Sequence, residues 1–164
     1  MANENEFVIT RVFNAPCELM FKVWTSAEHL EKWWGPVGFK MGVTKLDLRP
    51  GGVFHYSMTT PDGHTMWGKF VYHEITPPEK IVFVVSFSDA NEGFARHPMS
   101  NTWPLEILST LSFTEHEGKT TLTMTGTPIN ASDEECKTFV EGFAGMQQGW
   151  AGTMGQLEAY LATF

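Results

Sequence analysis

Cysteine and positive charge are scarce in this chain. Its two cysteines, Cys17 and Cys136, fit no metal-binding or redox spacing, so we expect two reduced thiols in or near the core. The 11 lysines and arginines are outnumbered by 19 aspartates and glutamates, which gives a formal net charge of −8. A nucleic acid or an anionic membrane surface would repel such a chain, so we expect neither as a partner.

Long hydrophobic runs are absent as well. No stretch reaches the ~18 consecutive apolar residues that mark a membrane-spanning helix. Residues 1–7 contain no hydrophobic segment of the kind found in signal peptides. A cytoplasmic protein is therefore expected.

Known catalytic signatures are also missing from the sequence. There is no nucleophile elbow, no phosphate-binding glycine loop and no HExxH motif. The histidines are scattered along the chain without the spacing of metal ligands. The sequence therefore predicts no catalytic residue, no metal site and no cofactor.

Apolar and aromatic side chains, by contrast, are abundant. Hydrophobic residues make up 42% of the chain and aromatic residues 13%, including 13 phenylalanines and 6 tryptophans. A chain of 164 residues can bury a substantial core without disulfides. We expect one domain that spans residues 1–164.

Apolar and polar residues alternate between turn signals, which predicts that most of the chain forms antiparallel strands. The expected strands are Phe7–Asn14, Val43–Leu48, Val53–Thr60, His64–Ile75, Lys80–Ser88, Leu105–Glu115 and Lys119–Thr127. Two short helices, Cys17–Trp24 and Ala27–Trp34, are expected after the first strand. Pro16 suits the first turn of a helix, and Ser26 suits an N-cap. Asp89–Pro104 is rich in turn formers and is expected to be irregular.

The hairpin around Pro61–Gly63 is the best-defined local element. A three-residue turn of this composition sets the register of the two flanking strands. The expected cross-strand pairs are Phe54 with Phe70, Tyr56 with Gly68, and Met58 with Met66. These side chains would form an inner apolar face, and His55, Trp67 and His73 would lie on the other face. Both histidines are expected at the surface.

The next strand extends this inner face. If Ile75 pairs with Lys80, then Phe83, Val85 and Phe87 join it. Glu74 would then share the face with Tyr56 and Tyr72, where a buried carboxylate beside two phenols can act as a general acid or base. The alternative is that Glu74, near the strand end, is exposed and paired with Lys80.

Apolar residues recur at helical spacing from Ser132 to Phe164, which predicts one long C-terminal helix. Ser132 and Glu135 have the spacing of a capping box at its start. Along one flank of the apolar stripe lie Gly142, Gly145, Gly149, Gly152 and Gly155. Such a row permits close packing on the sheet, widening of a cavity or contact between subunits, so a homodimer remains an alternative.

Several segments, taken in order, are similar to one known family. They are Arg11–Pro16, Trp24–Pro36, Asp47–Gly52, Pro61–Gly63, Glu74–Phe83 and Gly149–Trp150. The sequences Trp-Trp-Gly-Pro and Asp-x-Arg-Pro-Gly-Gly are the most specific of these. From Phe7 to Leu161 the chain resembles the bacterial homologues of the C-terminal domain of the heat-shock protein 90 ATPase activator. That family belongs to the START-like (SRPBCC, helix-grip) superfamily.

The resemblance implies an α+β helix-grip fold. In this fold a curved antiparallel sheet of six to seven strands is wrapped around a long C-terminal helix, and two short helices follow the first strand. A deep apolar cavity lies between sheet and helix. Superfamily members include lipid and hormone carriers, polyketide cyclase-like proteins, self-sacrifice resistance proteins and co-chaperone modules, so the fold does not select one function.

We expect the chain to bind a small hydrophobic or aromatic ligand in this cavity without catalysis. The residues expected to line the cavity are Trp34, Phe54, Tyr56, Met58, Phe70, Tyr72, Phe83, Val85, Phe87, Met99, Trp103, Phe143, Met146 and Trp150. Asp89–Pro104 is expected to form a partial lid. One alternative is a cyclase- or hydrolase-like enzyme that uses Glu74, Tyr56 or Tyr72 in the same cavity. Another is a chaperone-interacting module related to the activator.

Overall fold

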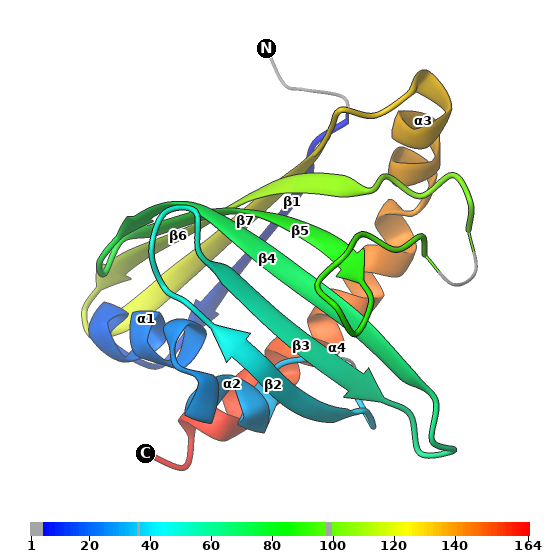
Figure 1. Cartoon of the computed structure of the whole chain (residues 1–164). Coiled ribbons are helices and arrows are strands. Elements are labelled where there is room, and N and C mark those ends of the chain that lie inside the picture. Colours follow the sequence, from blue (N-terminus) through cyan, green and yellow to red (C-terminus); the bar gives the residue numbers. More distant parts are fainter. Residues whose placement is uncertain (1–4, 36, 98–99) are drawn as a thin grey trace.

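A computed structural model of the chain describes residues 5–35, 37–97 and 100–164. One curved antiparallel sheet has the strand order β1-β7-β6-β5-β4-β3-β2 (Figure 1). The strands are β1 (Phe7–Phe13), β2 (Lys40–Leu46), β3 (Val53–Thr59), β4 (Thr65–Thr76), β5 (Lys80–Ser88), β6 (Glu106–His116) and β7 (Lys119–Ile129). The helices are α1 (Cys17–Thr25), α2 (Ala27–Trp33), α3 (Asp133–Glu141) and α4 (Phe143–Leu161). None of the helices in the described ranges has the length and apolar character needed to cross a membrane.

The helices cover one side of the sheet from end to end. Helices α1 and α2 lie at one end, and α4 runs from there toward the other end, where α3 lies (Figure 1). The β3–β4 hairpin has the three cross-strand pairs that the turn predicted. Behind this hairpin, Phe54, Phe70, Tyr72 and Phe83 are only 0% to 3% exposed and form a closed aromatic core. The rings of Phe70 and Phe83 stack with their centroids 4.1 Å apart.

A β-bulge in β4 changes the face of one candidate residue. Ile75 pairs with Ile81, one residue beyond the expected partner, and the register shifts between Tyr72 and Glu74. The bulge absorbs the extra residue, so the rest of the strand keeps the expected inner face. The prediction that Glu74 lies on that face is wrong, because the bulge turns its side chain outward. Its carboxylate lies 3.3 Å from Lys80 Nζ, and the side chain is about half exposed, which confirms the other interpretation, an exposed Glu74 paired with Lys80.

The outer face of β3 and β4 is covered where the sequence predicts an open surface. His55 is only 2% exposed. Its ring stacks on Trp67 at 5.2 Å, and its Nε2 donates to the Asp89 carbonyl oxygen at 2.8 Å. Lys69 Nζ likewise donates to the Glu92 carbonyl oxygen at 2.8 Å. The prediction of a surface position is wrong for His55, because the loop after β5 folds back over this face, a contact that no local pattern encodes. It is confirmed for His73, which is exposed.

The expected continuous helix from Ser132 to Phe164 is divided in two. Its predicted capping box is present, since Glu135 N donates to Ser132 Oγ at 3.1 Å and Ser132 N donates to Glu135 Oε1 at 3.0 Å. The break lies at Gly142, where φ is −86° and ψ is 0°. A Cβ at Gly142 would lie 3.0 Å from the Trp103 ring. The single-helix prediction is wrong because glycine favours helical geometry weakly and this site leaves no room for a side chain.

Helix α4 is held mainly through its C-terminal half. Met154, Leu157 and Leu161 are buried there, and Arg11 of β1 pairs with Glu158 at 2.6 Å. The first eight residues of the helix, by contrast, are exposed or half-buried. This one-sided anchoring leaves space between the sheet and the first half of α4.

Candidate ligand-binding site

A cavity of about 310 Å³ lies between the inner face of the sheet and α4. Its walls are Met58, Met66 and Phe87 from the sheet, Met146, Gly149, Trp150 and Thr153 from α4, and Trp34 and Gly35 from the end of α2. The Thr153 hydroxyl donates to the Gly35 carbonyl oxygen at 3.1 Å, so this polar group is already satisfied. The wall that remains for a ligand is almost entirely apolar.

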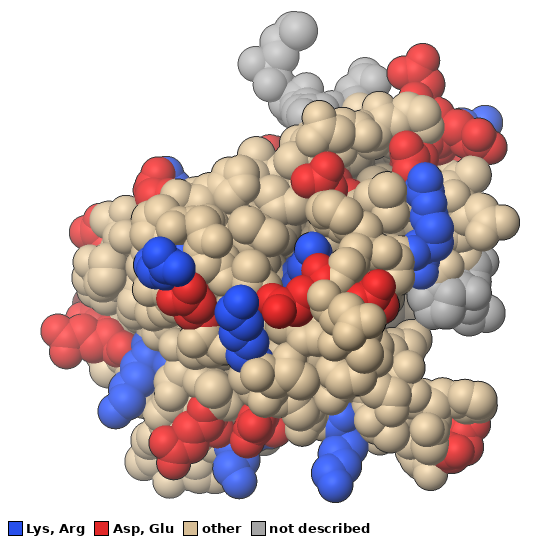
Figure 2. Space-filling model, viewed as in Figure 1, with Lys and Arg blue, Asp and Glu red and all other residues tan. Residues whose placement is uncertain are grey.

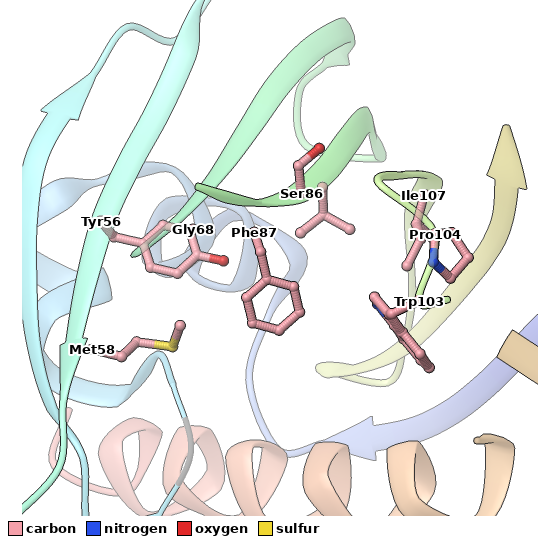
Figure 3. A pocket seen from close by; sticks show the side chains of 9 residues that line it. Tyr56, Met58, Gly68, Ser86, Phe87, Trp103, Pro104 and Ile107 are labelled. Carbon is pink, nitrogen blue, oxygen red and sulfur yellow. The ribbon is translucent and has the colours of Figure 1, made fainter. Parts of the chain in front are cut away.

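A second, smaller pocket of about 110 Å³ adjoins the first (Figure 3). It is lined by Tyr56, Met58, Gly68, Val85, Ser86, Phe87, Trp103, Pro104 and Ile107. Met58 and Phe87 line both spaces and therefore separate them. In Figure 3 the Phe87 ring points toward α4, between Tyr56 and Met58 on one side and Trp103 on the other. The rotamers of Met58 and Phe87 thus decide whether one ligand can occupy both spaces.

The structure brings most of the predicted ligand-binding residues to these two spaces. Trp34, Tyr56, Met58, Val85, Phe87, Trp103, Met146 and Trp150 line one or both. Phe54, Phe70, Tyr72 and Phe83 lie in the closed core and line neither. Phe143 also lines neither, and its ring packs between Phe7 at 5.5 Å and Phe139 at 5.4 Å. Met99 lies outside the described residues.

Some lining residues were not selected from the sequence. They are Gly35, Met66, Gly68, Ser86, Pro104, Ile107, Gly149 and Thr153. Met66 could have been found, because the predicted register already placed it opposite Met58. Gly149 belongs to the glycine row of α4, and no atom lies within 4 Å of the Cβ that a side chain there would add. This glycine therefore widens the cavity, whereas Gly152 packs closely, with Val37 Cγ2 3.1 Å from the corresponding position.

No charged side chain lines either space in the described part of the chain. Burial raises the pKa of both Tyr56 and Tyr72 well above the ordinary value of a phenol. Both phenols therefore stay protonated near pH 7, which disfavours them as general bases. Charge lies instead at the surface, where Figure 2 shows positive and negative side chains interspersed over the visible face.

The segment between β5 and β6 packs beside the smaller pocket. The His97 ring lies against Phe87 at 4.9 Å and Trp103 at 5.8 Å, and burial lowers the pKa of His97. The imidazole is therefore largely neutral at pH 7. Arg96 ties the segment to α3 through an ion pair with Glu135 at 2.6 Å. These contacts hold His97 and Arg96 in place beside the pocket.

A curved antiparallel sheet that holds a C-terminal helix, with an apolar cavity between them, defines a helix-grip protein. Within this class the chain belongs to the Activator of Hsp90 ATPase homolog 1-like family, whose family model matches residues 14–162. The resemblance inferred from its motifs is thereby confirmed. Proteins of this family and of the wider SRPBCC group commonly bind hydrophobic ligands.

Solved structures are similar over nearly the whole chain. Protein Ms6760 from Mycobacterium smegmatis is 30% identical with a TM-score of 0.79, over 96% of this chain and 91% of that one. A protein from Arthrobacter aurescens is 23% identical with a TM-score of 0.83, over 100% of this chain and 91% of that one. DynU16, from the dynemicin biosynthetic locus, is 18% identical with a TM-score of 0.67, over 97% of this chain and 48% of DynU16. These matches confirm the predicted helix-grip fold, while a comparison with curated proteins found no match.

Proposed function

We propose that the chain binds a small hydrophobic or aromatic molecule in the cavity between the sheet and α4, and that it catalyses no reaction on this ligand. The observation that carries the proposal is the cavity of about 310 Å³, walled by aromatic rings and methionines. The Trp34 and Trp150 rings lie 5.3 Å apart and offer flat apolar surfaces. Burial of apolar ligand surface supplies the affinity, and the flexible methionines adapt to its shape.

Ligand titration tests this proposal directly. Polycyclic aromatics and fatty acids are added while thermal unfolding and tryptophan fluorescence are followed. A ligand present at 100 times its Kd stabilises the native state by about 2.7 kcal/mol. For a chain of this size we expect the Tm to rise by roughly 5–10 °C. If none of these compounds raises the Tm or changes the fluorescence, the proposal is wrong.

A leucine at Gly149 is expected to block binding without unfolding the protein. The added side chain would project from α4 at the cavity wall, where nothing lies within 4 Å of its Cβ. It would therefore fill the space that a ligand occupies. Because the leucine and the ligand would overlap sterically, we expect the affinity for any cavity ligand to fall by about 100-fold or more. Isothermal titration calorimetry measures the loss.

Gly145→Leu is the matched control for this variant. Gly145 lies on the same helix, and nothing lies within 4 Å of its Cβ position either. It does not line the cavity, so ligand affinity is expected to stay within about twofold of the wild-type value. Equal loss of affinity in both variants would show that helix perturbation, rather than cavity filling, explains the effect.

The two alternatives receive less support. The cyclase- or hydrolase-like enzyme needs an acid or base in the cavity, yet no carboxylate or imidazole of the described residues lines either space. Glu74, its first candidate, is exposed and paired with Lys80. The chaperone-interacting module is suggested by the family's description alone. Retention of the purified chain by immobilised heat-shock protein 90 would be needed to favour it.

A further inference from the structure

Three of the nine methionines of the chain line the larger cavity. Met58 of β3 and Met66 of β4 are cross-strand partners, and Met146 lines the same cavity from α4. We call these three residues the cavity methionines. Met66 and Met146 are half-buried and retain contact with solvent, whereas Met58 is 8% exposed. Thioether sulfurs from three separate elements therefore converge on one space.

Other methionines of the described residues have different surroundings. Met20, Met124 and Met154 lie in the closed core and are at most 4% exposed. Met41 is half-buried and pairs with Met58 from the strand on its other side, but it lines neither space. The chain thus contains thioethers of the same chemistry that differ in burial and in their access to the cavity.

No thiol or imidazole competes with these sulfurs at the cavity wall. Neither a cysteine nor a histidine is found among the described residues that line the two spaces. Cys136, the half-buried thiol, belongs to α3. A small neutral oxidant that enters the cavity therefore meets thioether sulfur as the most readily oxidised group.

We propose that Met66 and Met146, and more slowly Met58, are sites of reversible oxidation by hydrogen peroxide, and that this modification lowers the affinity of the cavity for apolar ligands. The inference rests on the proposed function, because it concerns the regulation of the same cavity. The sulfur attacks one peroxide oxygen, so that an S–O bond forms and the O–O bond breaks. Sulfur loses two electrons, and the proton of the transferred oxygen passes to the leaving hydroxide, which becomes water. Methionine sulfoxide reductases reverse the change.

A sulfoxide makes the wall polar where it was apolar. Its oxygen is a hydrogen-bond acceptor that water hydrates in the empty cavity. An apolar ligand would remove that water without offering a donor, so we expect the affinity to fall by about tenfold or more per sulfoxide. Trp34 and Trp150 line the same wall, so the added hydration is expected to shift the tryptophan emission to longer wavelength.

Limited oxidation followed by peptide mass spectrometry locates the sulfoxides. The folded protein is treated with hydrogen peroxide and then with dithiothreitol, which reduces sulfenic acids and disulfides but leaves sulfoxides intact. We expect Met66 and Met146 to oxidise at least about tenfold faster than Met20 and Met154, because exposure governs the rate. Met154 is an internal control, since it lies on the same helix as Met146 but is only 2% exposed. Similar rates at all four positions would overturn the inference.

Fluorene binding before and after oxidation tests the consequence for the cavity. The wild-type protein is expected to lose affinity by about tenfold or more. Met66→Leu/Met146→Leu conserves side-chain volume and is expected to keep its affinity within about twofold after the same treatment. Met66→Leu alone, with partial protection expected, serves if the double variant does not fold. Met41→Leu is the matched control, because it removes a half-buried thioether outside the cavity and is expected to lose affinity like the wild type.

The outcomes separate this inference from the function on which it rests. If the cavity methionines oxidise first but the fluorene affinity stays the same, the proposed regulation is wrong while the proposed function stands. Equal protection by Met41→Leu would place the effect outside the cavity and would also overturn the inference. If neither fluorene nor any aromatic or lipid of the broader titration binds the unoxidised protein, the proposed function fails and the regulation fails with it, whereas mass spectrometry still decides the sites of oxidation.

Discussion

Replacing Gly52 with alanine is expected to lower the free energy of unfolding by about 3 kcal/mol, one of the two largest effects predicted for this chain. A Cβ at this position would lie 2.0 Å from the backbone carbonyl oxygen of Asp47 and 3.0 Å from that of Arg49. Both atoms belong to the main chain of a tight turn, so they cannot move aside as the end of a flexible side chain can.

The turn is tightly held, which is why the clash cannot be relieved locally. Gly52 N donates to the Arg49 carbonyl oxygen at 2.8 Å, and Tyr72 N donates to the Gly52 carbonyl oxygen at 3.0 Å. An ion pair also braces the turn, with Arg49 Nε 2.8 Å from Asp47 Oδ2. Moving the backbone at Gly52 would therefore break contacts with β4 as well as within the turn.

Urea unfolding followed by circular dichroism measures the effect of Gly52→Ala. Gly145→Ala is a suitable control, because nothing lies within 4 Å of its Cβ position and alanine favours a helix by about 1 kcal/mol over glycine. We therefore expect opposite shifts of the unfolding midpoint for the two variants. An unchanged midpoint for Gly52→Ala would show that the turn can rearrange, contrary to the packing described above.

Replacing Gly68 with alanine is expected to lower the free energy of unfolding by about 2 kcal/mol, through a clash with a side chain instead of the backbone. Gly68 pairs directly with Tyr56 across the β3–β4 ladder. A Cβ there would lie 2.5 Å from the Tyr56 hydroxyl oxygen. The Tyr56 ring lies over this glycine, so alanine must displace it from the aromatic core.

A double-mutant cycle isolates this contact. In a Tyr56→Leu background the ring is absent, and the cost of Gly68→Ala is expected to fall below about 0.5 kcal/mol, giving a coupling energy of roughly 1.5 kcal/mol between the two positions. Denaturant titration of the four proteins supplies the cycle. If Gly68→Ala costs the same free energy of unfolding in both backgrounds, the requirement for glycine at position 68 comes from the strand backbone and not from the Tyr56 ring.

The sheet was the most predictable part of the molecule because its signals are local. A three-residue turn at Pro61–Gly63 is enough to set the pairs of the β3–β4 hairpin, including the one between Tyr56 and Gly68. The inner and outer faces of these strands follow from the alternation of side chains along a strand. The start of α3 was predictable for a similar reason, since its capping box needs only Ser132 and Glu135.

The errors arose where the chain departs from a regular period. A single extra residue in β4 moves Glu74 to the outer face, and alternation alone cannot reveal such a bulge. The break at Gly142 lies within an unbroken helical pattern, and the Trp103 ring that leaves no room for a side chain there comes from a distant part of the chain. The burial of His55 depends on Asp89, 34 positions away, which reaches it only after the chain has folded.

The amino-acid sequence by itself determined the kind of elements, the hairpin register, the family and the apolar character of the candidate site, because turn chemistry and hydrophobic periodicity act over short distances. Only the tertiary structure decided which of the inward side chains border open space. Phe70 and Phe87 both point inward, yet one is sealed in the core and the other lines both pockets. The difference arises because the Trp34 ring, 5.4 Å from Phe70, covers that residue, whereas Phe87 shares its cavity with the first half of α4, whose residues are exposed or half-buried. Both arrangements depend on contacts between elements far apart in the chain.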